Sequence, residues 1–195
     1  ENLEGYRRVR GGDHPSTLTA MNNMGYLLDA LGMPTEAEPY YREALETSRR
    51  VLGDEHPDTL HSISNMGTLL DGQGKSSEAE PYYREALEVR RRVLGDEHPS
   101  TLDSLNNMGL LLHAQGRLSE AEPYYREALE AYRRVLGDEH PNTLNSIGNM
   151  GALLNSQGKS SEAEPYYREA LEASRRVLGD EHPSTLNSIS NMGSL

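Results

Sequence analysis

The sequence repeats itself with a constant period. A His-Pro pair begins at His14, His56, His98, His140 and His182, and each step between these histidines is 42 residues. A period of this length is the sequence signature of a solenoid, in which each structural unit stacks on the next. We therefore expect a single array with repeat 1 at 12–53, repeat 2 at 54–95, repeat 3 at 96–137 and repeat 4 at 138–179.

The residues outside these four repeats match parts of a repeat. Residues 1–11 align with the last third of a unit, and residues 180–195 align with the opening of a fifth unit. Each end of the chain therefore falls inside an expected helix, and neither end carries the polar terminal repeat that solenoids usually need. We expect the sequence to be a segment of a longer protein.

Each unit is predicted to form two antiparallel helices. In repeat 2, proline after His56 suits the first turn of a helix, where its missing N–H costs little. Apolar residues then recur at three- and four-residue spacing, which predicts one buried stripe: Leu60, Ile63, Met66 and Leu70. Gly72 and Gly74 are expected to end this first helix.

The second helix of repeat 2 is expected to begin at an S-x-x-E motif. Ser77 and Glu80 fit a capping box, in which the two side chains bond the free backbone N–H groups of the first turn. The motif places Pro81 in that first turn, where it removes a single hydrogen bond. Tyr82 and Tyr83 are interpreted as packing residues, not as a platform for stacked bases, and Gly95 is expected to end the helix.

Composition and motifs exclude several classes of function. The chain is 35% hydrophobic and has no apolar run long enough to span a membrane. Its net charge of −12 argues against a nucleic-acid or anionic membrane surface. It has no cysteine, and we expect no metal or cofactor because Asp54, Glu55 and His56 are three in a row and fit a capping turn better than a ligand set. No catalytic motif is present, so we expect a binding protein and not an enzyme, in the cytoplasm.

These repeats resemble a known family. The tetratricopeptide pattern W-x2-L-G-x2-Y followed by A-x3-F maps onto Met21, Met24, Gly25 and Leu28, and then onto Ala37 and Tyr41. The 42-residue unit with EAEPYYREALE, VLGDEHP and NNMG is similar to the kinesin light chain type of repeat, also seen in nephrocystin-3-like proteins. The resemblance implies an all-α fold, a right-handed tetratricopeptide superhelix (an α-solenoid), whose first helices line a concave groove for a peptide or a partner protein.

The differences between repeats support this groove. Repeats 2 and 4 differ at eight positions, and five of these lie on one side of the first helix, at positions that face the groove in the family. The variable groove positions are Thr19, Asn22, Tyr26 and Asp29 in repeat 1; His61, Ser64, Thr68 and Asp71 in repeat 2; Asp103, Asn106, Leu110 and His113 in repeat 3; and Asn145, Gly148, Ala152 and Asn155 in repeat 4. We expect these residues to set specificity.

One groove position is the same in every unit. Asparagine occurs at Asn23, Asn65, Asn107, Asn149 and Asn191. An amide can donate to and accept from an extended peptide backbone, which is the role the resemblance implies, although an asparagine can equally bond a neighbouring helix. The variable positions offer aspartates and no lysine or arginine, so we expect a polar or basic peptide. Arg50, Arg92, Arg134 and Arg176 are expected to pair with glutamates and the helix dipole instead of reaching the groove.

Two other functions stay open at this point. Nearly identical repeats could form a structural spacer, or a rod whose ends stack on one another through incomplete repeats. The array could also be the sensor of a larger signalling ATPase, as nephrocystin-3-like architectures suggest.

Overall fold

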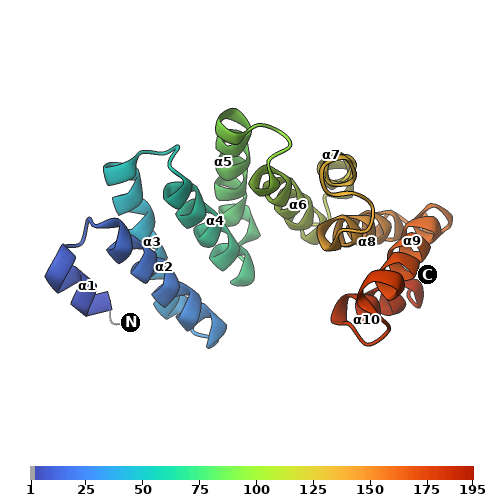
Figure 1. Cartoon of the computed structure of the whole chain (residues 1–195), viewed down its shortest axis with the longest axis horizontal. Coiled ribbons are helices and arrows are strands. Elements are labelled where there is room, and N and C mark those ends of the chain that lie inside the picture. The colour runs from blue at the N-terminus through green and yellow to red at the C-terminus, as the bar shows by residue number, and fades with distance from the viewer. Residues whose placement is uncertain (1–2) are drawn as a thin grey trace. The chain divides into compact units, whose positions relative to one another are not determined.

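The computed structural model describes residues 3–195, and every regular element in this part of the chain is an α-helix (Figure 1). The helices are α1 (Leu3–Arg10), α2 (Pro15–Ala30), α3 (Pro34–Leu52), α4 (Pro57–Gly72), α5 (Ser76–Leu94), α6 (Pro99–Ala114), α7 (Leu118–Leu136), α8 (Pro141–Ser156), α9 (Ser160–Leu178) and α10 (Pro183–Met192). Within these described residues, no helix combines the length and the apolar character needed to cross a membrane.

The helices group into two compact units, which divide after Gly95. In the first unit, α2 packs on α3 and α4 packs on α5, and the two pairs join through contacts of α3 with α4 and of α2 with α4. In the second unit, α6 packs on α7 and α8 on α9, with α7 against α8 and α10 against α9. The expected all-α solenoid of antiparallel helix pairs is confirmed.

The histidines of the repeated His-Pro pair cap the first helix of each unit. The Nδ1 atom of His56 accepts a hydrogen bond from the backbone N–H of Asp58 at 3.2 Å, and Pro57 is the first helical residue. The same bond forms at His98 and His140, also at 3.2 Å. A side-chain acceptor at this position satisfies one of the free N–H groups of the first turn. The capping interpretation is therefore confirmed, and the described residues contain no cluster that could hold a metal ion.

A glycine in a left-handed conformation ends each of the four first helices α2, α4, α6 and α8. Gly74 has φ of +75°, its N–H bonds the carbonyl of Asp71 at 2.8 Å, and the N–H of Lys75 bonds the carbonyl of Leu70 at 2.9 Å. This pair of bonds is a Schellman motif, and it satisfies carbonyl groups that the helix itself leaves free. The residues that follow enter the second helix directly.

The predicted start of the second helix was wrong by one to two residues. The helix begins at Ser76, after Lys75, which makes no side-chain capping bond. Because the Schellman turn leads straight into the helix, Ser77 already lies inside its first turn and cannot act as the cap of a capping box. Pro81 consequently falls in the second turn and not the first. The hydroxyl of Ser76 instead donates to the carboxylate of Asp71 at 2.6 Å and so ties the two helices of the pair together.

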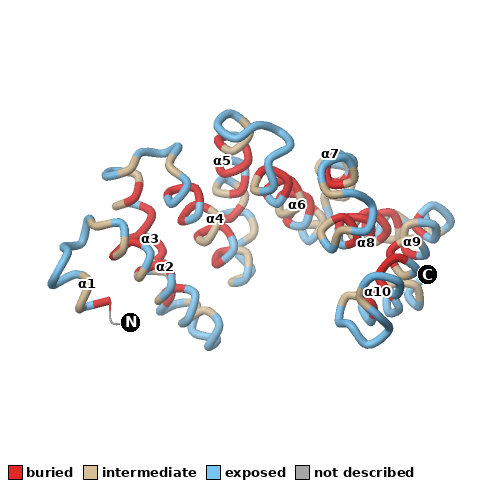
Figure 2. The backbone as a smooth tube through the Cα atoms, in the orientation of Figure 1, coloured by how far each residue is buried: buried red, intermediate tan, exposed pale blue. Residues whose placement is uncertain are grey.

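The core lies between the helices, as Figure 2 shows: buried residues run along the middle of the helices and the turns are exposed. One tyrosine of each Tyr-Tyr pair is buried there, and it packs on the glycine of the N-M-G motif. A Cβ atom on Gly109 would lie 2.7 Å from Cδ1 of Tyr125, and one on Gly151 would lie 2.7 Å from Cδ1 of Tyr167. The packing role predicted for the tyrosines is therefore confirmed, and the glycine provides room for the ring.

Candidate peptide-binding groove

The first helices of neighbouring repeats lie side by side inside each unit, and their faces carry the predicted groove residues. Contacts join α2 with α4 in the first unit, and α8 with both α6 and α10 in the second. In the second unit these faces enclose a hollow of about 310 Å³. It is lined by Asn106, Leu110, Leu144, Asn145, Gly148, Asn149, Ser184, Asn187, Ser188 and Asn191. We call this hollow the amide groove, because five of its ten lining residues are asparagines and none is charged.

The repeated asparagines form side-chain bonds between neighbouring first helices. Nδ2 of Asn65 donates to Oδ1 of Asn22 at 3.3 Å, and Nδ2 of Asn149 donates to Oδ1 of Asn106 at 2.9 Å. Each bond joins a repeated asparagine to the variable position 43 residues earlier. The alternative that sequence reasoning left open, an asparagine bonded to a neighbouring helix, thus occurs at both sites. Each bond uses one of the two amide N–H groups, so the side chain retains hydrogen-bonding capacity.

The repeated asparagines differ in exposure. Asn23 is exposed, whereas Asn65, Asn107, Asn149 and Asn191 are half-buried. Half-burial between two helices orients a side chain while leaving part of it open to a ligand. Asn149 and Asn191 line the amide groove and are partly open to solvent, and the bond to Asn106 orients the amide of Asn149.

The variable positions of the first unit have unequal access to a ligand. Asn22 is buried, and its Nδ2 donates to the hydroxyl of Ser62 at 3.0 Å, so this residue supports the helix contact from inside. Four positions are exposed: Thr19, Tyr26, His61 and Thr68. The remaining predicted positions of this unit are half-buried: Asp29, Ser64 and Asp71. A ligand could therefore reach the exposed and half-buried positions, which include the carboxylates of Asp29 and Asp71.

Several variable positions of the second unit already have partners. The carboxylate of Asp103 accepts from the hydroxyl of Tyr132 at 2.6 Å. Nε2 of His113 lies 2.9 Å from the hydroxyl of Ser156, and its ring meets Tyr125 edge-on with 6.2 Å between ring centres. Burial lowers the pKa of His113, because a charged imidazole loses hydration there. This histidine is therefore neutral near neutral pH.

The remaining predicted positions lie nearer the amide groove. Asn155 accepts from the hydroxyl of Ser160 at 3.0 Å, and its Nδ2 donates to the carbonyl of Ser194 at 3.4 Å. Asn145 is exposed and lines the amide groove, as Asn106 and Leu110 do. The amide groove thus brings together Asn106 and Leu110 of α6 with Asn145 of α8. The side chain of Asn155 instead bonds Ser160 at the start of α9.

The arginines at the ends of the second helices pair with acidic residues, as the sequence indicated. Each bonds a residue of the turn that precedes the first helix of its own repeat. The pairs are Arg50 with Asp13, Arg92 with Glu55, Arg134 with Glu97, and Arg176 with Glu139, all at 2.6 to 2.7 Å. These pairs are exposed and screened by solvent, so they contribute little stability. Because of these pairs, the four guanidinium groups are bound to carboxylates outside the amide groove.

Sequence reasoning missed four of the lining residues: Leu144, Ser184, Asn187 and Ser188. Asn187 could have been found, because it lies one 42-residue period after Asn145 on the next first helix. Leu144 is 4% exposed and belongs to the buried stripe, so nothing in its sequence position distinguishes it from a core residue.

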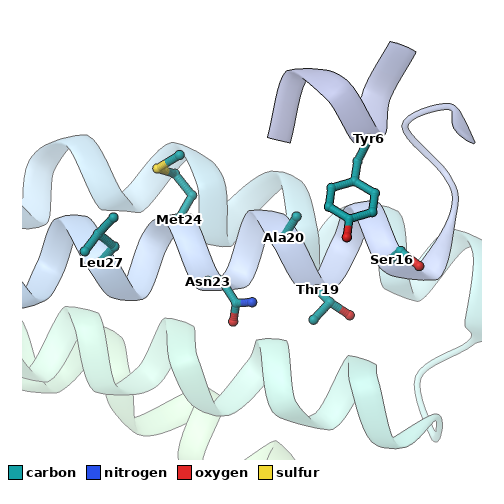
Figure 3. Close-up of a pocket in the computed structure, with 7 residues that line it drawn as sticks. All are labelled: Tyr6, Ser16, Thr19, Ala20, Asn23, Met24 and Leu27. Atoms are coloured by element: carbon teal, nitrogen blue, oxygen red, sulfur yellow. The ribbon is translucent and has the colours of Figure 1, made fainter. Parts of the chain in front are cut away.

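A second hollow lies on the face that α1 and α2 present away from α4. It measures about 380 Å³ and is lined by Tyr6, Ser16, Thr19, Ala20, Asn23, Met24 and Leu27 (Figure 3). The corresponding residues of α4, including Met66 and Leu69, are each 1% exposed because the array continues over them. Leu27 is 52% exposed. We call this surface the open face.

Stacked antiparallel helix pairs whose first helices share a polar face define a helical-repeat scaffold. The profile of the tetratricopeptide repeat family matches residues 1–49, 30–92, 78–134, 104–175 and 147–195. These matches run through the whole chain. The chain belongs to the tetratricopeptide repeat family.

Solved structures of kinesin light chain-like proteins share this fold. A protein of this kind from Podosopora anserina, with nearly identical repeats, superposes with a TM-score of 0.80 at 24% identity, covering 92% of this chain and 85% of that one. A variant of the same protein gives 0.81 over 84% of its length. BtubC from P. vanneervenii gives 0.84 at 24% identity, covering 98% of this chain and 78% of its own. No curated protein matches the sequence. At this identity the likeness shows the fold alone.

Proposed function

We propose that the chain is a protein-interaction scaffold that binds a peptide or partner segment along the groove formed by its first helices. The amide groove carries this proposal. Three consecutive first helices, α6, α8 and α10, contribute asparagines to one hollow of about 310 Å³. Concave sites with a few convergent polar groups are the usual places where proteins bind ligands.

The side chains suit an extended polypeptide. A peptide backbone alternates N–H donors with carbonyl acceptors, and an amide side chain offers both kinds of group at once. The 42-residue repeat places asparagines on successive first helices, with Asn106 and Asn149 in one bonded pair and Asn145 and Asn187 around the same hollow. A partner in a regular conformation can therefore meet several amides in succession.

Charge points to a neutral or basic partner. The amide groove has no charged lining residue. In the first unit the same face offers the carboxylates of Asp29 and Asp71 and no lysine or arginine among the predicted positions. Acidic peptides would find no counter-charge at these positions, and the chain as a whole carries a net charge of −12.

Binding accounts for this geometry better than catalysis does. The repeated asparagine occurs in five units, whereas catalysis needs one asymmetric group of residues in which a nucleophile, an acid or a base is positioned against a single bond. Tetratricopeptide repeats form a family of scaffolds. We propose that this chain acts in the same way.

The test compares partner capture by the natural chain and by a variant with Asn65→Ala and Asn107→Ala. Both substitutions remove the repeated amide, and we expect a discrete partner recovered with the natural chain to be lost. The control variant carries Glu46→Ala and Glu88→Ala, which change exposed residues of α3 and α5. Cross-linking followed by mass spectrometry then asks whether the partner contacts the first helices. Retention of the partner by the double asparagine variant would contradict the proposal.

Thermal unfolding distinguishes a binding role from a structural one. Asn65 is half-buried and its bond to Asn22 is long, at 3.3 Å, so its loss should lower stability by no more than about 1 kcal/mol. A much larger loss of stability in the double variant would mean that the repeated asparagine is mainly structural.

The open face supports a second candidate function, self-association. Inside the array, α4 packs against the preceding repeat, mainly against its second helix α3, so the corresponding face of α2 is already shaped to receive a helix. We propose that a second copy of the chain occupies it, since α10 exposes Leu186 and Ile189. Sedimentation velocity should then show a mass that rises with concentration, and Leu27→Lys should abolish the rise. A mass that is monomeric at every concentration would contradict self-association.

A further inference from the structure

The two bonded asparagine pairs share a geometry that Asn191 cannot adopt. In both pairs, the repeated asparagine donates through Nδ2 to a side-chain oxygen on the neighbouring first helix, 43 residues earlier. The acceptor is Asn22 in one pair and Asn106 in the other. The same step from Asn191 leads to Gly148, which has no side chain and therefore no acceptor.

The missing side chain leaves a gap beside the amide of Asn191. A Cβ atom placed on Gly148 would have no neighbour closer than Nδ2 of Asn191, at 4.0 Å, apart from the backbone of its own helix. Both residues line the amide groove. The amide nitrogen of Asn191 thus faces a space that is open to a ligand and that in the preceding step holds the carboxamide of Asn106.

We propose that this gap between Gly148 and Asn191 is the subsite that anchors a bound peptide, and that a backbone carbonyl of the peptide accepts from Nδ2 of Asn191. The inference rests on the proposed function and adds the position and the chemistry of the anchor. A peptide carbonyl is the closest chemical match to the side-chain carbonyl of Asn106, which accepts the equivalent bond from Asn149. The peptide carbonyl replaces the acceptor that Gly148 lacks.

The surroundings of the gap define which peptide residue fits. Leu110 is 44% exposed and offers an apolar contact at the edge of the amide groove, and Asn145 and Asn187 supply further donors and acceptors. A charged side chain buried at this point would have no counter-ion among the lining residues, which is costly. The subsite therefore selects an extended segment with an uncharged side chain.

The test uses peptides selected from a phage-displayed library of random dodecapeptides on the natural chain, then synthesised with a fluorescent label. Fluorescence anisotropy measures their affinity for the natural chain, for Gly148→Asn and for the control variant Glu172→Ala. Asparagine at 148 supplies the missing acceptor and fills the gap, so we expect affinity to fall at least about tenfold, the loss of one well-placed hydrogen bond together with its space. Glu172→Ala changes an exposed residue of α9 outside the amide groove, so we expect affinity to stay within about twofold of the natural value.

An ester scan of the peptide tests the hydrogen bond itself. Replacing one backbone amide by an ester weakens the carbonyl before it as an acceptor, and a single position should lose about threefold to tenfold in affinity. That loss should disappear in Asn191→Ala. Helical circular dichroism of each variant confirms that it is folded.

The remaining outcomes separate the anchor from the groove. If the peptides bind Gly148→Asn as tightly as the natural chain but fail to bind the variant with Asn65→Ala and Asn107→Ala, the anchor is overturned and the groove stands. If no peptide is enriched, or if the selected peptides bind every variant equally, the groove and the anchor are both overturned. Equal weakening by Gly148→Asn and by the control variant Glu172→Ala would overturn the anchor.

Discussion

Two glycines on one helix should respond in opposite ways to the same substitution. Gly148 and Gly151 both lie inside α8, so replacement by alanine brings the same gain in helix propensity, about 1 kcal/mol, at each position. Gly148 has room for a Cβ atom, as described above. A Cβ on Gly151 would lie 2.7 Å from both Cδ1 and Cε1 of Tyr167, far inside the separation of about 3.5–4.0 Å at which carbon atoms attract each other.

The ring of Tyr167 cannot move away easily, because its residue is 2% exposed and packed between helices. Forcing a methyl group into a close-packed site costs about 1–3 kcal/mol. Gly148→Ala should therefore stabilise the chain by about 1 kcal/mol, whereas Gly151→Ala should be neutral or destabilise it by up to about 2 kcal/mol. The two free energies of unfolding should differ by about 1–3 kcal/mol.

Urea denaturation followed by circular dichroism at the helical band measures this difference, and thermal denaturation should separate the two midpoints by about 2–12 °C. The comparison between the two variants cancels the propensity term, which is the least transferable part of the estimate. Equal shifts in the two variants would refute the claim that the N-M-G glycine exists to admit the tyrosine ring.

Three further predictions concern single contacts. Burial lowers the pKa of His113 in the folded chain below its unfolded value of 6.5, so the unfolded state takes up the proton first and stability should fall as pH drops below that value. Chemical denaturation at about pH 7 and about pH 5 should therefore show a smaller loss of stability between the two pH values in His113→Asn than in the natural chain. His140→Ala should destabilise the chain by about 1 kcal/mol in urea, and His140→Asp, which keeps a side-chain acceptor, should recover most of it. Tyr132→Phe removes the bond to Asp103 and should cost about 0.5–1.5 kcal/mol; an unchanged midpoint would show that the carboxylate is fully compensated by water.

The local features that could be predicted correctly from the sequence depend only on residues a few positions away. The histidine cap, the proline at the first helical position and the glycine ends follow from backbone geometry within one turn. The start of the second helix was predicted less well, because two competing local signals meet there. The Schellman turn around Gly74 leads directly into the helix, and the capping-box motif at Ser77 is left inside it.

The partners of the groove residues could not be read from the sequence. The period places Asn22, Asn65, Asn106 and Asn149 on one face, but the spacing of 43 residues between bonded asparagines combines one repeat with one step along the helix. That offset depends on how neighbouring helices pack. For the same reason, the sequence showed Gly148 as one more variable position, and the packing of α8 with α10 identified it as the place where an acceptor is missing.

The sequence by itself determined the repeat, the helix pairs, the family and the residues that occupy the first helices, because a 42-residue period repeated along the chain forces each unit into the same local structure. The tertiary structure alone decided which of those residues form contacts between helices and which remain accessible to a partner. Asn22 is buried in the contact between α2 and α4, whereas Asn145 and Asn191 line a hollow. The physical reason is that burial and hydrogen bonding depend on side chains from the neighbouring repeat, whose distance and orientation no single repeat specifies.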